Sequence, residues 1–393
     1  MAPKATRCRE GEAGYNVLMN GTMGDTLRSQ TISTQLQQIA QQAVDYPDRM
    51  FTTLAHRMDI PFLRDAYRRA KKTGAPGVDN MTAKDYAVNL EANLKDLHKR
   101  LKEGCYKAPP VKRVWIKKEN GKERPIGIPG FEDKIVQRAV EMLISPIYEQ
   151  EFYDFSMGFR KGRSQHQAIQ YVREQCWTQN IKWVISADIT GLFDNINKKM
   201  LKDLIRLKVN DGRIIRLIGK WLNAGVMEEN KTVYPDKGTP QGGVVSPVLS
   251  NIFLHYVLDD WFVKAVIPRM KGRCFIVRWA DDFIIGCETE TDANRIMEVL
   301  PKRFGSYDLS LHPTKTVMIP FDRPPASSGN DKRNGTFDFL GFTFYWARSL
   351  KGYWIIKKKT SGKRIKRFMK MLWQWTRAYR HDPVWGQHLA LSS

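Results

Sequence analysis

Three aspartates end or interrupt apolar runs that have the composition of buried strands. Asp188 closes the run WVISAD, and Asp281 with Asp282 separates IVRWA from FIIG. Carboxylates at such positions lose hydration without gaining packing, so their charge should have a use. Mg²⁺ is typically held by one or two carboxylates with water and substrate phosphates, and two ions about 4 Å apart can activate a hydroxyl and neutralise a leaving pyrophosphate. The alternative, an acidic pair that simply marks a hairpin turn, weakens when the second strand-end acid and the Gly-rich loop KGTPQGG are added.

The elements around these acids alternate between strands and helices. Strands are predicted over 183–188, over the two halves of 274–287 joined at Asp281–Asp282, and over the pair FDFLGFTFYW. Other elements predicted from periodicity and turn residues are helices within 51–102 broken at GAPGVD, a hairpin over 111–129 turning at Asn120–Gly121, a helix over 131–150, a helix after the N-cap Asn197, a helix capped by Ser246 with Pro247 in its first turn, a helix over 292–304, and a strand through 316–319. This order predicts an α+β sheet domain over about 181–346, with a loose or partly helical lead-in over 1–45.

The chain is strongly basic. Its 393 residues include 64 Lys and Arg against 41 Asp and Glu, which gives a formal net charge of +23. Hydrophobic residues make up 42%, enough for a sizeable core, so wholesale disorder is excluded. The charge excess indicates nucleic acid or another polyanion as the partner.

A large share of this charge lies near the C-terminus. Residues 351–380 contain 11 Lys and Arg and no Asp or Glu. The apolar residues that step along this segment at helical spacing are Ile365, Phe368, Leu372, Trp375 and Tyr379. Cations interleaved with aromatic residues favour contact with phosphates and stacking on bases, and a solvated amphipathic surface is the alternative.

The sequence also indicates where the protein works. Charge interrupts every long apolar run before about 18 residues, so no segment is predicted to span a bilayer. The N-terminus lacks the apolar stretch of a secretion signal. Five cysteines lie far apart without a CxxC pair, which predicts a reduced protein without structural zinc. We therefore expect a cytoplasmic protein with no membrane partner.

Eight short blocks occur in one order over about residues 50–345: GAPGVD, KKENGKERPIGIP, FSMGFRKGRSQHQAI, SADITGLFDNI, GTPQGGVVSPVLSNIFL, RWADDFIIG, LHPTKT and FDFLGF. Together they resemble the reverse transcriptases encoded by group II introns. The resemblance implies a right-hand polymerase with an N-terminal extension over 1–50, fingers over 51–180, a palm over 181–346 and a partial helical thumb over 347–393. It implies two Mg²⁺, for which Mn²⁺ can substitute, an RNA template such as intron RNA, a DNA or RNA primer, and deoxynucleoside triphosphates. The oligomeric state is left open.

The resemblance also implies roles for residues at matching positions. The metal ligands would be Asp188, Asp281, Asp282 and the carbonyl of Ile189, and Lys315 would protonate the pyrophosphate, with a solvated lysine as the alternative. The nucleotide contacts would come from Lys118, Arg124, Phe193, Gln241 and Gly242. Phe193 would exclude a ribose 2′-hydroxyl, with ordinary core packing as the alternative. The primer grip would be Phe339, Leu340 and Gly341. Nucleic acid would be contacted by Arg68, Arg69, Lys112, Arg113, Arg160, Arg163, Lys363, Arg364 and Arg367, with a structural role as the alternative for Arg160 and Arg163.

Two features depart from the family pattern. Trp279 replaces the usual Tyr before Ala280, which keeps an apolar wall but removes a hydroxyl, so rate or fidelity should differ. The basic C-terminal segment is expected to be only the first helix of the thumb, or X region, with no HNH nuclease after it. The alternatives to an active intron polymerase are a maturase-like RNA-binding splicing factor, a truncated inactive relic, and another bacterial reverse transcriptase of the diversity-generating or defence-associated kind.

Overall fold

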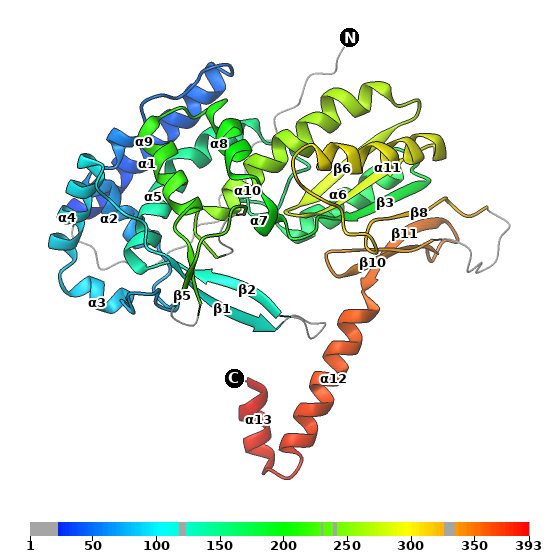
Figure 1. Cartoon of the computed structure of the whole chain (residues 1–393). Helices are drawn as coiled ribbons and strands as arrows, with labels where there is room; N and C mark the ends of the chain where they lie inside the picture. Colours follow the sequence, from blue (N-terminus) through cyan, green and yellow to red (C-terminus); the bar gives the residue numbers. More distant parts are fainter. Residues whose placement is uncertain (1–22, 118–122, 229–230, 239–241, 326–334, 393) are drawn as a thin grey trace.

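In the computed structural model, the described part of the chain combines helices with three β-sheets, which makes the protein α+β as predicted (Figure 1). The structure describes residues 23–392 except 118–122, 229–230, 239–241 and 326–334. We call the three sheets the hairpin sheet (order β2-β1-β4-β5), the central sheet (order β6-β7-β3-β8) and the C-terminal sheet (order β11-β10-β9).

The described strands are β1 (Val111–Lys117), β2 (Glu123–Ile128), β3 (Trp183–Asp188), β4 (Val226–Glu228), β5 (Lys231–Val233), β6 (Cys274–Trp279), β7 (Asp282–Cys287), β8 (Val317–Pro320), β9 (Phe337–Phe339), β10 (Phe342–Arg348) and β11 (Trp354–Thr360). The described helices are α1 (Met23–Asp45), η1 (Ala55–Arg57), α2 (Ile60–Arg69), α3 (Ala83–Val88), α4 (Leu90–Glu103), α5 (Phe131–Glu151), α6 (Gln165–Thr178), α7 (Leu192–Asn195), α8 (Lys198–Arg206), α9 (Gly212–Leu222), α10 (Ser246–Leu254), η2 (His255–Asp259), η3 (Phe262–Val266), η4 (Ile267–Arg269), α11 (Glu290–Gly305), α12 (Gly362–Tyr379) and α13 (Val384–Ser392).

Three strands of the central sheet, β3, β6 and β7, are buried on both faces along most of their length. β3 pairs antiparallel with β7 on one side and with β8 on the other, and β6 pairs antiparallel with β7. Successive residues of one strand enter different cores: Val184 belongs to the cluster that includes Ile169 of α6, and Ile185 to the cluster that includes Leu300 of α11. Burial on both faces explains why the sequences of these strands are continuous apolar runs. An aspartate at the end of such a run is therefore easy to recognise in the sequence.

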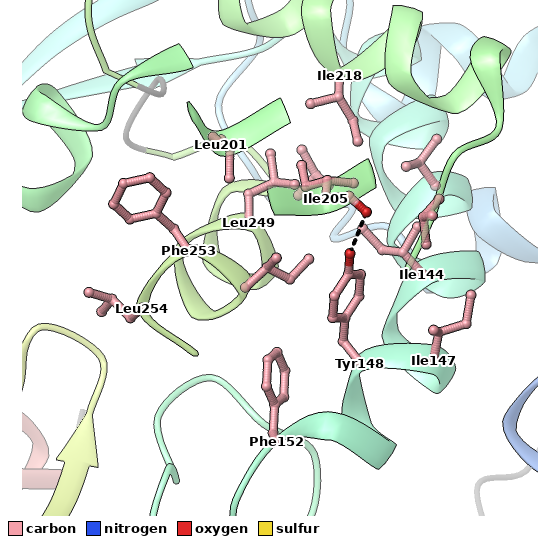
Figure 2. Close-up of a cluster of buried hydrophobic side chains, with 14 of the residues drawn as sticks. Ile144, Ile147, Tyr148, Phe152, Leu201, Ile205, Ile218, Leu249, Phe253 and Leu254 are labelled. Carbon is pink, nitrogen blue, oxygen red and sulfur yellow. Dashed lines mark hydrogen bonds between the residues drawn. The ribbon is translucent and has the colours of Figure 1, made fainter. Parts of the chain in front are cut away.

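A second part of the core joins helices that lie far apart in the sequence (Figure 2). Tyr148 of α5 donates a hydrogen bond from its hydroxyl to the carbonyl of Ile205 in α8 over 2.9 Å. The ring of Tyr148 is buried, and this bond gives its hydroxyl the hydrogen-bond partner that a buried tyrosine requires. Other members of the cluster drawn there are Ile144, Ile147, Phe152, Leu201, Ile218, Leu249, Phe253 and Leu254. This packing holds α8, which follows β3 and α7 in the chain, against α5.

The N-terminal helix belongs to the same core. Ile32, Ile39 and Ala43 of α1 are buried, and their spacing places them on one face of the helix, which packs on α5 and α2. The lead-in that was expected to be loose or partly helical over 1–45 is therefore helical from Met23 to Asp45, and residues 1–22 lie outside the described residues.

Most elements predicted from sequence are confirmed, with corrections at their ends. Asn197 caps α8 as predicted, accepting hydrogen bonds from the Lys199 and Met200 N–H groups over 3.0 and 3.1 Å. Ser246 is not the N-cap of α10 but its first residue, after Val245, and no side chain caps this helix end. At this helix start the Val245 N–H instead donates a hydrogen bond to Gln137 Oε1 of α5 over 3.4 Å. α11 begins at Glu290, two positions earlier than predicted, because Thr289 caps it. The predicted hairpin turn at Asn120–Gly121 lies outside the described residues.

The basic C-terminal segment contains a strand that periodicity did not predict. β11 pairs antiparallel with β10 from Arg348 opposite Trp354 to Phe342 opposite Thr360. The predicted amphipathic helix is confirmed as α12, and none of its described residues is buried. In Figure 1 α12 projects from the C-terminal sheet, away from the rest of the chain. No helix among the described residues is long and apolar enough to cross a membrane.

Candidate active site

The three predicted aspartates meet at one end of the central sheet. Asp188 is the last residue of β3, Asp282 is the first of β7, and the two are direct partners in the antiparallel register. Asp281 lies in the turn between β6 and β7, where Trp279 pairs with Asp282. The sequence placed Asp281 and Asp282 together on the turn, but the turn is Ala280–Asp281 and Asp282 belongs to the strand, because the ladder pairing extends one residue further. The carboxylates therefore come from the paired ends of two adjacent strands, β3 and β7, and from the turn before β7.

A tight backbone contact supports this turn. Ala280 adopts φ +58°, in the left-handed region that residues with a side chain rarely occupy. Gly158, which lies in a predicted motif, packs directly against it: a β-carbon at Gly158 would lie only 2.3 Å from the Ala280 nitrogen. Glycine is required at this position because any side chain would displace the turn that carries Asp281.

Burial and mutual repulsion act on the acidic pair. Asp282 is exposed as a residue, but the protein around its carboxyl group removes part of its hydration and raises its pKa well above the ordinary value, and the neighbouring Asp281 and Asp188 carboxylates raise it further. Burial and Asp188 also raise the pKa of Asp281, whereas its own backbone N–H, Arg124 and Lys315 oppose the rise. The negative charge of the three carboxylates is therefore only partly balanced, and Arg124 and Lys315 provide that partial balance.

Lys315 lies where the resemblance predicted a catalytic lysine. Its Nζ donates a hydrogen bond to Asp188 Oδ2 over 2.6 Å. The residue follows a turn that begins at His312, whose N–H donates to the Asp188 carbonyl over 2.8 Å. Both the backbone and the ammonium group thus bring this turn to the end of β3. The lysine side chain is 60% exposed, so its ammonium group is accessible from solvent.

The chemistry of the three carboxylates suits a hard divalent cation. Closely spaced acids with raised pKa values are stabilised by added positive charge, and here the Lys315 ammonium already neutralises Asp188. In the part of the chain that the structure describes, no group of three or more His, Cys, Asp or Glu side chains is arranged to hold a metal ion. The support for a metal site is thus the oxygen donor set rather than a preformed geometry. Ile189 is buried and its backbone pairs with Leu311, so the role of its carbonyl stays a prediction.

Three of the five predicted nucleotide contacts, Arg124, Phe193 and Gly242, lie in the part of the chain that the structure describes. Arg124 of β2 is exposed and close enough to Asp281 to lower that carboxyl's pKa. Gly242, at φ +108°, packs on the same hairpin: a β-carbon there would lie 2.5 Å from the Gly127 carbonyl oxygen. Phe193 of α7 is 8% exposed, five residues after Asp188. Lys118 and Gln241, the other predicted contacts, lie outside the described residues.

The predicted primer grip forms the turn between β9 and β10 and touches the next helix. Leu340 and Gly341 adopt φ +51° and φ +79°, and Phe339 is buried. The Ser361 N–H donates to the Gly341 carbonyl over 3.0 Å. A β-carbon at Gly341 would lie 2.1 Å from Arg364 Cζ, so the guanidinium of Arg364, in the first turn of α12, packs on this glycine. Contact with a primer stays a prediction.

The cations predicted to contact nucleic acid differ in their surroundings. The exposed ones are Arg68, Arg69, Lys112, Lys363, Arg364 and Arg367. Arg69 pairs with Asp65 at 2.9 Å, Arg113 with Glu228 at 3.5 Å, and Arg163 with Asp154.

Arg160 requires a correction. Its side chain is 5% exposed, pairs with Glu149 at 2.9 Å and donates to the carbonyls of Tyr153 and Ser156. Because these partners occupy the guanidinium group inside the protein, the structure favours the structural alternative for Arg160 over nucleic-acid contact.

Sequence reasoning missed one residue that borders the site. Arg278 lies inside the apolar strand β6, and both it and its ion-pair partner Asp259 are fully buried. An arginine within the run IVRWA was a usable signal, since a buried guanidinium requires a partner acid. The sequence could not identify Asp259 of η2 as that partner, because only the packing of η2 against β6 brings the two together.

Carboxylates at one end of an antiparallel sheet, with an arginine and a lysine beside them, define a site suited to metal-assisted phosphoryl or nucleotidyl transfer. Residues 116–344 match the family described as "Reverse transcriptase (RNA-dependent DNA polymerase)". The chain is 33% identical over 314 residues to "Protein YkfC" of Escherichia coli (strain K12), which covers 72% of this chain and 79% of that protein.

Two further relatives are named for introns. The chain is 38% identical over 227 residues to "Group II intron-encoded protein LtrA" of Lactococcus lactis subsp. cremoris, covering 56% of this chain and 37% of that protein. It is 34% identical over 240 residues to "Uncharacterized 91 kDa protein in cob intron" of Schizosaccharomyces pombe, covering 60% of this chain and 29% of that protein. The chain thus spans well under half the length of either intron-named relative. This chain belongs to the reverse transcriptase family, which its motifs predicted.

Proposed function

We propose that this protein is an RNA-directed DNA polymerase of the group II intron type, which extends a DNA or RNA primer along an RNA template with deoxynucleoside triphosphates. The observation that carries the proposal is the meeting of Asp188, Asp281 and Asp282 at one end of the central sheet, with Arg124 and Lys315 beside them. In a right-hand polymerase, the N-terminal helices and the hairpin sheet would act as the fingers. The central sheet would be the palm, and α12 the start of the thumb.

The chain's own residues account for most of the proposed chemistry. Asp188, Asp281 and Asp282 would hold two Mg²⁺, or Mn²⁺ in their place, which when bound would activate the primer hydroxyl and neutralise the pyrophosphate. Arg124 would bind the triphosphate and orient it, because its planar guanidinium can contact phosphate oxygens in pairs. Lys315 would carry the proton that the leaving pyrophosphate accepts, since its ammonium group already lies at the edge of the carboxylate cluster.

The nucleic acid would be held by backbone contacts rather than by base recognition. α12 carries Lys363, Arg364 and Arg367 with the exposed aromatic residues Phe368 and Trp373. Cations with stacking surfaces bind a phosphate backbone with little dependence on sequence. The same surface could hold folded intron RNA, so assistance to splicing is a further activity that this proposal includes.

Primer extension on an RNA template in Mg²⁺ tests the proposal. The full chain should incorporate deoxynucleotides, and Asp281→Asn should lower the rate at least about 100-fold, because it removes one carboxylate charge from the cluster. Asp203→Asn is a matched control, since Asp203 is an exposed acid of α8 whose ion-pair partner is Arg206.

The proposal is wrong if Asp281→Asn extends primers at the rate of the unmodified protein. It is also wrong if the folded, unmodified protein extends no primer. Intron splicing measured in parallel should survive Asp281→Asn, since RNA binding needs the cationic surfaces and not this carboxylate.

A further inference from the structure

The guanidinium group of Arg278 has every one of its N–H donors occupied inside the protein. Nε donates to Asp259 Oδ1 at 2.8 Å, and Nη2 donates to Asp259 Oδ2 at 2.5 Å and to Ser156 Oγ at 2.6 Å. Nη1 donates to Asn251 Oδ1 at 3.0 Å and to the Ala280 carbonyl at 3.2 Å. Five donors with five acceptors is the full capacity of an arginine side chain. No other side chain could satisfy this set of acceptors.

These partners surround the turn that carries the catalytic acid. Phe155 accepts a hydrogen bond from the Arg278 N–H, and the Met157 N–H donates to the Arg278 carbonyl, both over 2.9 Å. Asn251 Nδ2 donates to the Gly158 carbonyl over 2.8 Å, and Gly158 in turn packs on the Ala280 nitrogen. The arginine therefore ties the 155–158 segment, α10 and η2 to one two-residue turn.

The contact with Ala280 acts on the peptide group next to Asp281. The carbonyl that accepts from Arg278 Nη1 and the N–H of Asp281 belong to the same planar peptide unit. The Cα of Asp281, from which its side chain departs, lies in this same planar unit. Holding the Ala280 carbonyl in place thus fixes the orientation of the backbone that carries the Asp281 carboxylate. Because Ala280 adopts an unfavourable left-handed φ, this peptide would turn to a commoner conformation if nothing held it in place.

We propose that Arg278 is a positioning residue of the active site, which fixes the Ala280–Asp281 peptide and thereby aims the Asp281 carboxylate at the bound metal and the primer end. The inference rests on the proposed polymerase function and deepens it by adding a residue that touches neither substrate nor metal. Asp259 neutralises the arginine in the interior, so that the guanidinium serves as a rigid set of donors rather than as a charge on the acidic cluster.

Arg278→Lys tests the proposal, because it keeps the charge but has a single nitrogen in place of the planar fork. At equal amounts of folded protein, measured by circular dichroism, we expect kcat for primer extension to fall about 10- to 100-fold, with KM for the deoxynucleotide nearly unchanged. The affinity for Mn²⁺, measured by loss of the free-ion electron paramagnetic resonance signal, should fall about 10-fold. The same Mn²⁺ measurement on Asp281→Asn shows which bound ions belong to this site, because those ions are the ones whose binding this variant weakens.

Arg303→Lys is the matched control. Arg303 donates to the carbonyls of Val257 and Tyr256 at 2.9 and 3.0 Å, so its change loosens the same region of the chain that holds Asp259 without touching the turn. It should lower stability but leave kcat and Mn²⁺ affinity unchanged. If Arg278→Lys does not fold, Ser156→Ala decides, because it removes one acceptor of the guanidinium and should lower kcat and Mn²⁺ affinity in the same direction, to a smaller degree.

Normal kcat and normal Mn²⁺ affinity in folded Arg278→Lys, or in Ser156→Ala where the lysine variant does not fold, would overturn the inference and leave the polymerase proposal standing. An equal loss of kcat in Arg303→Lys would also overturn it, since the effect would then be general loosening. An unmodified protein that neither extends primers nor binds Mn²⁺ would instead overturn the polymerase proposal, and the inference with it.

Discussion

At the scale of single residues, the role of each charged side chain depends on the partners that the fold provides. Arg160 and Arg278 are buried and hydrogen-bonded, so they act within the protein. Arg124 and Lys315 are exposed and lie beside Asp281 and Asp188, where they can meet a charged substrate. The same residue types thus serve structure or chemistry according to burial, which a count of cations cannot reveal.

Phe193 should decide which sugar the enzyme accepts. Phe193→Ala removes the ring proposed to exclude a 2′-hydroxyl, so discrimination against ribonucleotides should fall by about 10-fold or more. The measurement is the ratio of kcat/KM for a deoxynucleotide to that for the matching ribonucleotide. Phe193→Tyr keeps the bulk of the ring and should keep the ratio; an unchanged ratio in Phe193→Ala would show that the ring serves only as core packing.

Asp133 should make stability depend on pH. It is buried and accepts hydrogen bonds from the Tyr106 hydroxyl, from Trp221 Nε1 at 2.7 Å and from Gln137 Nε2 at 2.8 Å. Burial raises its pKa to about 6, despite these donors. Between pH 4 and 6 the folded state therefore keeps a proton that the unfolded state has lost, so this group's contribution to stability falls as pH rises through that window.

Asp133→Asn removes this titration but keeps one oxygen for Tyr106 and Trp221. The unfolding free energy of the variant minus that of the unmodified protein should rise by about 3 kcal/mol from pH 4 to pH 7. Urea unfolding at a series of pH values measures the difference. A difference that does not vary with pH would mean that Asp133 ionises at its ordinary pKa in the folded protein.

At the scale of elements, the turn between β9 and β10 positions α12. Gly341→Ala should displace Arg364, because the new β-carbon would lie 2.1 Å from Arg364 Cζ. We expect weaker binding of a primer–template duplex, measured by fluorescence anisotropy, since the Arg364 guanidinium would have to leave its place over this turn. The positive φ itself adds a cost of about 1–2 kcal/mol in stability.

Gly352→Ala separates these two effects. Gly352 adopts φ +81° in the turn before β11, and nothing lies within 4 Å of a β-carbon placed there. It should lose similar stability without a change in duplex affinity. Equal affinity in the two variants would mean that the anchoring of α12 on Gly341 has no part in binding.

At the scale of the whole molecule, the chain has a net charge of +23, and we expect the cations of α12, rather than this total, to set how strongly salt weakens nucleic-acid binding. Replacing Lys363, Arg364 and Arg367 with Gln should reduce the magnitude of the slope of log affinity against log salt by about 2 to 3. The reason is that binding then makes fewer phosphate contacts and so releases fewer counterions from the nucleic acid. Replacing the exposed Lys84, Lys95 and Lys99 with Gln changes the net charge equally and should leave the slope nearly as it was. Equal slopes in both variants would show that overall charge, and not α12, controls binding.

Local patterns carried the sequence predictions a long way. Strands β3, β6 and β7 were predictable because their apolar runs are buried on both faces, and α5, α8 and α12 because their apolar residues recur at helical spacing. The motif order pointed to the family, and the strand-end aspartates to the site. Errors arose where a long-range contact decides: α10 starts beside Gln137, and β11 forms because β10 is there to pair with it.

The sequence by itself was enough to predict the family, the three acids and the basic C-terminal helix. Each of these features can be recognised in short motifs, whose residues are near neighbours along the chain. Tertiary structure alone decided that Asp188 and Asp282 are direct partners, that Arg124 and Lys315 face them, that Arg160 is buried, and that Arg278 is satisfied by Asp259 and the Ala280 carbonyl. These relations join residues brought together only by strand pairing and helix packing. Spacing along the chain carries no record of them.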